Sequence, residues 1–311
     1  MRWTLETMPR QAGRTVLVTG ATSGLGLAAS VALARVGARV LLTARDPERG
    51  RAALDRVREQ GGGAGADAEL VQLDLADLAS VHRAADDVRS RTGDALHVLM
   101  NNAGVMGTPR GVTADGFETQ IGTNHLGHAA LTWLLMPALR HAGAARVVTL
   151  SSLAHRAGGL DVDDLDFTRR RYRPDRAYSA SKLANLLFAA ELDRRLRIAG
   201  DDVMSVAAHP GLTATELLPN SMRLRSGSLV GAATLFNALT SQPVRIGVLP
   251  QLYAATAEQV RGGDYIGPAS FGETRGLPAP ARRTAAALDV ELATRLWDVT
   301  AAATGVRPDP A

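Results

Sequence analysis

The sequence predicts an α/β protein with one doubly wound parallel sheet that is covered by helices on both faces. Three observations support this fold class. Short apolar runs alternate with longer helical patterns through the first two-thirds of the chain. The runs are continuously apolar, which is typical of strands buried on both faces. A glycine-rich turn joins the first run to a helical pattern, as in nucleotide-binding sheets.

Six strands are expected in this region, at residues 15–19, 40–43, 70–73, 96–100, 147–150 and 203–207. Helical patterns separate all six, which favours parallel pairing through crossover helices. From residue 211 the pattern becomes mostly helical, with residues 265–266 as a final edge strand. Because no linker interrupts the chain, residues 1–311 are expected to form a single domain. Its core would cover residues 14–267, and residues 268–311 would be a helical C-terminal extension.

Composition narrows the chemistry. Of the 311 residues, 46% are hydrophobic and 21% are charged, which is typical of a globular domain and excludes a disordered chain. The absence of cysteine excludes thiolate catalysis, disulfides and Fe–S ligation, so redox chemistry would need a bound cofactor. The net charge of +4, from 35 basic and 31 acidic residues, does not indicate nucleic-acid binding. Among the basic residues, Lys182 is the only lysine.

No targeting or membrane segment is expected. The first twenty residues contain three arginines and no apolar run of seven, unlike a secretion signal. The apolar stretch at residues 229–239 has about 11 residues, whereas a membrane-spanning helix needs about 20. The sequence therefore predicts a cytoplasmic protein without a membrane span.

The turn after the first strand has the composition of a phosphate-binding loop. It reads Thr-Gly-Ala-Thr-Ser-Gly-Leu-Gly over residues 19–26, and a helical pattern follows. Glycines allow close backbone approach, and a helix N-terminus offers unpaired N–H groups to a pyrophosphate. An ordinary strand-to-helix turn is the alternative, since three residues separate the first two glycines. The cofactor contacts expected here are Gly20, Ser23, Gly24, Leu25 and Gly26.

The end of the second strand predicts which cofactor is bound. A carboxylate at Ala44 would bind the ribose 2′-hydroxyl of NAD, whereas Arg45 offers a planar guanidinium to a 2′-phosphate. NADP(H) is therefore expected to be preferred over NAD(H). In the alternative interpretation, Arg45 is solvated and pairs with Asp46 or Glu48.

Polar residues also follow the third and fourth strands. Asp74 closes the third strand, and Asn-Asn-Ala-Gly follows the fourth at residues 101–104. The ligand crevice of an open α/β sheet lies at these carboxyl ends, although turn chemistry alone is the alternative explanation. The cofactor contacts expected here are Asp74, Leu75, Asn102, Ala103 and Gly104.

Tyr178 and Lys182 are the strongest catalytic candidates. They are four residues apart in a helical pattern and so share one face. An ammonium beside a phenol stabilises the phenolate, so a lowered tyrosine pKa is expected, suited to proton transfer to a carbonyl or from an alcohol. Since Lys182 is the only lysine among 35 basic residues, an incidental pairing with one of four tyrosines is a poor explanation.

Ser152 and Asn124 complete the catalytic candidates. Ser152 follows the fifth strand, where its hydroxyl would bind the reacting oxygen, although helix capping is the commoner role of such a serine. Asn124 begins the run Asn-His-Leu-Gly-His within a helical pattern. His125 and His128 have no acidic cluster beside them, so a structural role is favoured and no metal is expected.

Over residues 14–267 the chain resembles the short-chain dehydrogenase/reductase family. The resemblance rests on six features in this order: the glycine turn, Asn-Asn-Ala-Gly, Asn124, Ser152, Tyr178 and Lys182. The resemblance implies a Rossmann fold in which Tyr178 transfers the proton, and Lys182 lowers its pKa and holds the nicotinamide ribose. It also implies that Ser152 orients the substrate oxygen and that Asn124 anchors a water relay to Lys182. Asp74 would contact adenine. The nicotinamide carboxamide would be bound by the segment that contains Pro210, Gly211, Thr213 and Thr215.

Within the family, the runs at residues 115–118, 124–128 and 181–185 look like the retinol dehydrogenase and protochlorophyllide reductase-like branch. The family's habit of pairing the helices of Asn124 and Tyr178 implies a homodimer or homotetramer. Leucines and a methionine after Thr215 would form an apolar substrate lid, although core packing explains them equally well. An arginine-rich insert at residues 158–176 is either a solvated surface loop or a basic rim for an anionic substrate or partner.

The sequence thus predicts NADPH-dependent reduction of a small-molecule substrate, an apolar aldehyde or ketone, to an alcohol, reversibly. A non-catalytic NADP-binding redox sensor is one alternative. A methyltransferase that binds S-adenosylmethionine at a similar glycine turn is another, and it would give Lys182 no role.

Overall fold

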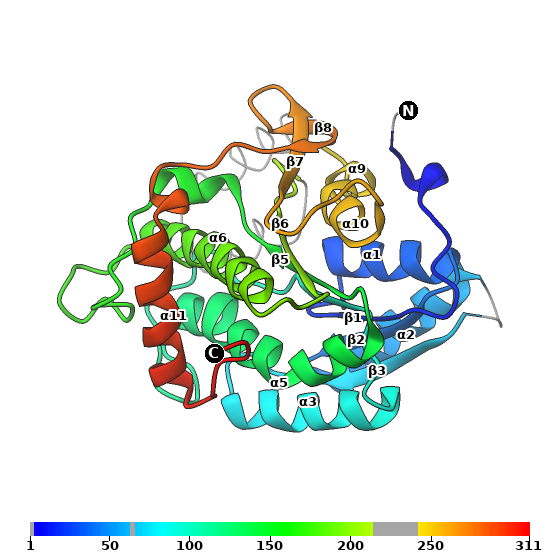
Figure 1. Ribbon diagram of the computed structural model, residues 1–311, viewed down its shortest axis with the longest axis horizontal. Coiled ribbons are helices and arrows are strands. Elements are labelled where there is room, and N and C mark those ends of the chain that lie inside the picture. The colour runs from blue at the N-terminus through cyan, green and yellow to red at the C-terminus, as the bar shows by residue number, and fades with distance from the viewer. Residues whose placement is uncertain (1–2, 63–65, 214–241) are drawn as a thin grey trace, which may run out of the picture.

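The sheet has eight strands in the order β3-β2-β1-β4-β5-β6-β7-β8. All neighbouring pairs are parallel except β7 and β8. The computed structural model describes residues 3–62, 66–213 and 242–311 (Figure 1). The strands are β1 (Thr15–Val18), β2 (Arg39–Ala44), β3 (Ala68–Gln72), β4 (Val98–Asn101), β5 (Arg146–Leu150), β6 (Met204–Ala208), β7 (Tyr265–Ser270) and β8 (Arg275–Pro280). This is the predicted doubly wound sheet.

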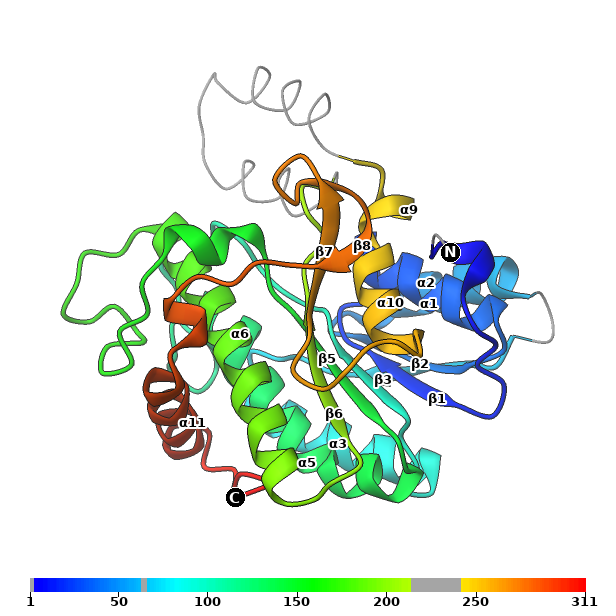
Figure 2. The same cartoon turned by 45° about the horizontal axis from the view of Figure 1, so that its top comes forward.

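Helices cover both faces of the sheet (Figures 1 and 2). One face is covered by α1 (Gly24–Arg35), α2 (Pro47–Gly61), α9 (Val244–Gly247) and α10 (Leu249–Thr256). The other carries α3 (Leu78–Thr92), α5 (Gly127–Ala142) and α6 (Pro174–Ile198), and α11 (Val290–Thr304) packs outside α5 and α6. Short helical segments are Leu5–Thr7, α4 (Thr119–Ile121), a π-helical turn at Gly122–Leu126, Leu153–Ala157 and Ala286–Leu288.

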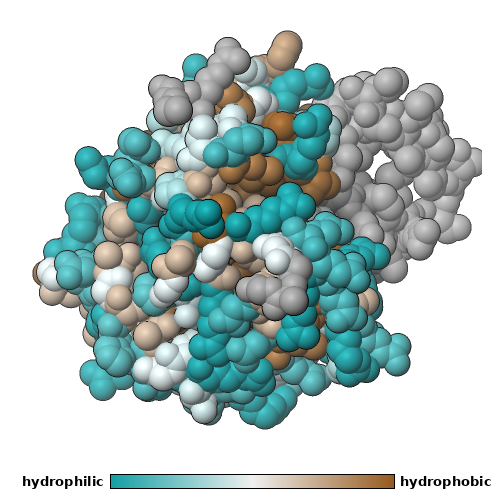
Figure 3. Space-filling model, turned by 90° about the vertical axis from the view of Figure 1, so that its right-hand side faces the viewer, coloured by the Kyte–Doolittle hydropathy of each residue, from teal (hydrophilic) through white to brown (hydrophobic). Residues whose placement is uncertain are grey.

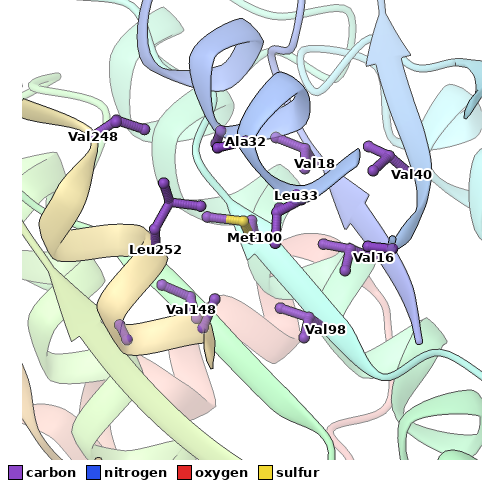
Figure 4. Packing of buried hydrophobic residues seen from close by; sticks show 14 of the residues in the cluster. Val16, Val18, Ala32, Leu33, Val40, Val98, Met100, Val148, Val248 and Leu252 are labelled. Carbon is purple, nitrogen blue, oxygen red and sulfur yellow. The ribbon is translucent and has the colours of Figure 1, made fainter. Parts of the chain in front are cut away.

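The central strands are buried on both faces, as their apolar runs predict. Val16 and Val18 on β1 face α1, whereas Leu17 between them belongs to the core on the side of α3 and α5. Figure 4 shows the first of these cores, where valines of neighbouring strands meet Leu33 of α1 and Leu252 of α10. On the face drawn in Figure 3, hydrophilic side chains gather at the lower right, whereas apolar side chains show in the upper middle.

The C-terminal region differs from the sequence prediction. β7 continues to Ser270, so the expected extension at residue 268 begins inside a strand, and β8 adds an antiparallel edge strand. β8 contains Pro278 and Pro280, which argue against a strand in a sequence. An edge strand accepts proline because only one side of its backbone is paired. Beyond β8 the chain is helical as expected, in α11.

The expected substrate lid lies outside the described residues. Its apolar positions are Leu217, Leu218, Met222, Leu224, Leu229 and Leu235. Within the described part of the chain, no helix has the length and apolarity needed to cross a membrane.

Candidate active site

A cavity of about 280 Å³ lies at the carboxyl ends of β1, β2, β3 and β4. The strand order reverses between β1 and β4, and such switch points are where open α/β sheets bind ligands. All eleven cofactor residues predicted from the first four strand ends line it. They are Gly20, Ser23, Gly24, Leu25, Gly26, Arg45, Asp74, Leu75, Asn102, Ala103 and Gly104.

The glycine turn is built for close backbone approach. Gly20 has a φ of +65°, and a Cβ there would lie 2.8 Å from the Cα of Ala103. A Cβ on Gly26 would overlap the carbonyl oxygen of Gly20. Ser23 is the N-cap of α1, yet its side chain makes no capping hydrogen bond, so the first-turn N–H groups are not capped by it. A pyrophosphate fits this cradle, because it would accept from those N–H groups at the positive end of the helix.

The turn is fastened to the loop after β4. The hydroxyl of Thr19 accepts hydrogen bonds from the backbone N–H groups of Asn102 and Ala103, both at 2.9 Å. The Asn102 amide in turn donates to the carbonyl of Thr19 at 2.7 Å. Asp74 holds its own turn by accepting from the N–H of Ala76 at 3.0 Å. Asn102 and Asp74 therefore stabilise their own turns and also line the cavity.

Arg45 lines the cavity just after β2. The neighbouring Asp46 caps α2 by accepting from the N–H groups of Glu48 and Arg49 at 2.9 and 3.0 Å. These backbone bonds hold the pKa of Asp46 below its usual value, with smaller contributions from the charges of Arg49 and Arg45. The carboxylate of Asp46 is thus engaged by the helix backbone. A second arginine, Arg49, also lines the cavity.

Sequence reasoning missed several lining residues. The missed residues are Thr22, Thr43, Ala44, Asp46, Arg49, Leu73, Val105 and Thr123. Most adjoin predicted residues. Arg49 carried a usable signal, because it lies four residues after Arg45 in the first turn of a helix that starts with Asp46 and Pro47.

Tyr178, Lys182 and Ser152 converge beside the cavity. Tyr178 and Lys182 are one turn apart on α6, and the Lys182 Nζ lies 5.8 Å from the centroid of the tyrosine ring. The Ser152 side chain, which follows β5, lies near enough to the Tyr178 phenol to lower its pKa. A Cβ on Gly104 would lie 3.4 Å from the Lys182 Nζ, so the loop after β4 closely approaches this lysine.

The expected lowering of the Tyr178 pKa is wrong for this structure. Burial raises the pKa of Tyr178, and the interaction with Ser152 opposes that shift only in part. Lys182 donates to the carbonyl of Leu150 at 3.1 Å, and its Nζ lies toward the tyrosine ring. Burial also lowers the pKa of Lys182 to about 8. Burial is therefore the largest cause of the pKa shift in both groups.

Asn124 is held in a π-helical turn, where the sequence predicted a regular helix. Its amide donates to the Val105 carbonyl and to the Ser181 hydroxyl, both at 2.9 Å, and its Oδ1 accepts from the Val105 N–H at 2.8 Å. Its own carbonyl pairs with His128 Nδ1 at 3.0 Å. These contacts clamp the loop after β4 to α6. The water relay expected of Asn124 stays a prediction.

The segment after β6 lies at the same carboxyl edge of the sheet. Gly211 has a φ of +65°, and the Thr213 hydroxyl donates to the Pro210 carbonyl at 2.7 Å. None of these three residues lines the cavity at β1 to β4. Thr215 lies outside the described residues.

His125 and His128 are both fully buried, and burial lowers their pKa values to about 3 and about 4. Within the described ranges, no group of three or more histidine or acidic side chains is arranged to hold a metal ion.

The arginine-rich insert is held together by internal contacts. Arg170 pairs with Asp164 at 3.0 Å, and Arg173 pairs with Asp175 at 3.0 Å. Arg169 donates to the backbone carbonyl of Asp163, and Arg176 to that of Ala157. These contacts favour a folded surface segment over a basic rim.

The sequence matches the short chain dehydrogenase family over residues 14–224. It is 39% identical to human retinol dehydrogenase 13 over 297 residues, and the aligned region covers 94% of this chain and 85% of that protein. It is 40% identical to mouse polyprenol dehydrogenase over 296 residues, and the aligned region covers 93% of this chain and 83% of that protein. A crystal structure of a protein from Mycobacterium paratuberculosis matches with a TM-score of 0.81, 40% identity and 99% coverage of both chains.

The geometry and these likenesses agree. A dinucleotide cradle lies at the strand-order switch, and a tyrosine, a serine and a buried lysine meet next to it. Members of this family use NAD(P) to oxidise alcohols or reduce carbonyl groups. The chain belongs to the short-chain dehydrogenase family, in its retinol dehydrogenase-like branch.

Proposed function

We propose that this protein is an NADP-preferring oxidoreductase that reduces an apolar aldehyde or ketone to its alcohol, reversibly, with Tyr178 as the proton donor. The observation that carries this proposal is the convergence of the Tyr178 phenol, the Ser152 side chain and the Lys182 amine beside the dinucleotide cradle. A phenol and a hydroxyl so placed form a binding site for one oxygen atom, which is what carbonyl reduction requires.

Each residue then has a separate task. The bound nicotinamide supplies the hydride. Ser152 donates a hydrogen bond to the substrate oxygen, and Tyr178 transfers its proton to that oxygen as negative charge develops there. Lys182, whose amine lies under the tyrosine ring, stabilises the phenolate that results. In alcohol oxidation the same phenolate removes the hydroxyl proton.

The preference for NADP rests on Arg45. Arg45 lines the cavity just after β2. The last residue of β2 is Ala44, which has no carboxylate to bind a ribose hydroxyl, and the carboxylate of Asp46 caps α2. A charge-assisted bond to a 2′-phosphate contributes about 1.5–3 kcal/mol.

The apolar substrate is supported by the names of the relatives. Retinol and polyprenol, the alcohols in those names, are both long and apolar. For this protein we propose only the shared substrate class, apolar alcohols and the corresponding carbonyl compounds. We do not propose retinol or polyprenol as its substrate.

The test is a panel of apolar and polar carbonyls and alcohols, read at the nicotinamide absorbance with NADPH and with NADH. Turnover of apolar carbonyls with NADPH is expected, and Tyr178→Phe should reduce kcat at least about 100-fold. Tyr178→Phe activity within threefold of the parent would remove the proposed acid. Tight NADPH binding without turnover of any compound would favour the redox-sensor alternative.

A further inference from the structure

A second polar network lies behind the active-site lysine. The backbone carbonyl of Leu150, the last residue of β5, accepts two hydrogen bonds. One comes from the Lys182 Nζ at 3.1 Å and the other from the Asn185 Nδ2 at 2.9 Å. Because both donors bind one oxygen atom, they lie within about 6 Å of each other. Leu150 directly precedes the two serines at the end of β5, so this carbonyl is part of the wall of the active site.

Asn185 is an unexpected residue at this depth. It is 1% exposed on α6, between the buried Ala184 and Leu186. A buried amide destabilises the fold unless its polar atoms are bonded, and an apolar residue would suit this face of α6 without that requirement. Its Nδ2 donates to the Leu150 carbonyl, and its side chain lies near enough to His125 to oppose in part the lowering of the His125 pKa by burial.

His125 joins this network to the C-terminal helix. Its Nε2 lies 2.9 Å from the hydroxyl of Thr300 on α11, and both residues are fully buried. His125 thus lies between Thr300 on α11 and Asn185 on α6, whose amide shares the Leu150 carbonyl with Lys182.

We propose that Asn185, His125 and Thr300 are positioning residues for Lys182, and that α11 is in this way part of the support of the active site. The inference rests on the role proposed above for Lys182. Asn185 fixes the direction of the Leu150 carbonyl, which places the lysine amine under Tyr178. His125 and Thr300 keep the Asn185 amide from rotating. The other titratable groups facing Lys182 are Tyr178 on the same helix and His128 on α5.

Two matched threonines on α11 test the long-range part of the network. Thr300→Val removes the hydroxyl that bonds His125, whereas Thr304→Val removes a hydroxyl that bonds only within α11 and its C-terminal end. The two substitutions are the same in chemistry and lie one turn apart. Thr300→Val should lower kcat about threefold to tenfold, because a small misplacement of a catalytic group has a large effect on rate. Thr304→Val should leave kcat within about twofold of the parent.

The Lys182 amine is measured directly by NMR on protein labelled with ¹³C-lysine. A chain with one lysine gives one Cε resonance, whose shift with pH reports the Lys182 pKa. Asn185→Asp places a carboxylate within about 6 Å of the amine and should raise that pKa by at least about one unit. Asn185→Leu adds no charge and should instead reduce kcat by up to about 100-fold, with a native unfolding transition.

The outcomes separate the two proposals. An unchanged Lys182 pKa in Asn185→Asp, or equal kcat in Thr300→Val and Thr304→Val, would overturn the positioning network. Parent-level activity in Tyr178→Phe would instead overturn the proposed function and leave the NMR result standing. A raised pKa in Asn185→Asp together with the contrast between the two threonine variants would establish the network.

Discussion

Lys182 has a proposed role in catalysis, yet its burial lowers the stability of the folded protein. The residue is 4% exposed, and burial lowers its pKa to about 8, so the folded protein holds this group against a desolvation cost. The sequence identified Lys182, because a single lysine among 35 basic residues lies one turn from a tyrosine. It did not give the direction of the Tyr178 shift, because burial depends on segments far apart in the chain.

Lys182→Met is expected to stabilise the protein at pH 7 by about 1–3 kcal/mol while abolishing turnover. The pKa falls from 10.5 to about 8 on folding, so below pH 8 both states are protonated and the full destabilisation is present. Between pH 8 and 10.5 the unfolded chain binds more protons, so the stability of the parent rises toward that of the variant. Urea unfolding of both proteins at pH 7 and pH 10 measures the difference. A variant less stable than the parent at pH 7 would contradict the prediction.

Arg45→Ala should change cofactor choice without changing chemistry. Loss of a charge-assisted bond to a 2′-phosphate is expected to raise the KM for NADPH about tenfold to a hundredfold, with the KM for NADH within about twofold. Initial rates with both cofactors provide the check. Arg171→Ala, an exposed arginine of the insert, is the matched control. Equal effects on both cofactors would assign Arg45 to a role other than phosphate recognition.

At the scale of elements, α11 was expected to be helical, but its packing partners could not be predicted. Trp297 stacks on Phe188 of α6 at 5.5 Å between centroids and meets Trp133 of α5 edge-on at 4.9 Å. The Arg195 guanidinium lies over its ring at 4.8 Å. The sequence indicated a helix there but not its partner, because long-range packing has no local signature. The π-helical turn at Asn124 was missed for a related reason, since one extra residue in a turn leaves the helical pattern nearly unchanged.

Trp297→Ala should destabilise the protein by about 3–5 kcal/mol, because it leaves a large cavity between α11, α5 and α6. Val290→Ala, at the exposed start of the same helix, should change stability by less than about 0.5 kcal/mol. Chemical denaturation of both variants gives the comparison. Similar values for the two would mean that α11 contributes little to the cooperative fold.

At the scale of the whole molecule, the strand-order switch collects the site from several crossover units. The parallel strands were predictable because burial on both faces requires continuous apolar runs. Their carboxyl ends then predicted eleven residues that line one cavity, since topology brings those ends to one edge. What the sequence could not supply was the set of contacts between these units, such as the Thr19 hydroxyl that joins the first turn to the loop after β4.

Cofactor binding should therefore stabilise the molecule as a unit. At a concentration of about 100 times its Kd, a ligand that binds only the folded state adds about 2.7 kcal/mol to the free energy of unfolding. NADPH is expected to raise the melting temperature more than an equal concentration of NADH, and Arg45→Ala should remove most of that difference. Differential scanning fluorimetry without substrate measures this independently of turnover. Equal shifts with the two dinucleotides in the parent protein would argue against the preference.

The prolines of β8 also govern how the sheet ends. An edge strand with free N–H and C=O groups is a template on which another chain can add a strand, and aggregation begins at such edges. Pro278 and Pro280 have no N–H to donate, and at the opposite edge β3 has Glu69 paired with Arg39 at 2.5 Å. Both borders of the described sheet are thus poor templates, so we expect this fold to resist fibril growth by strand addition.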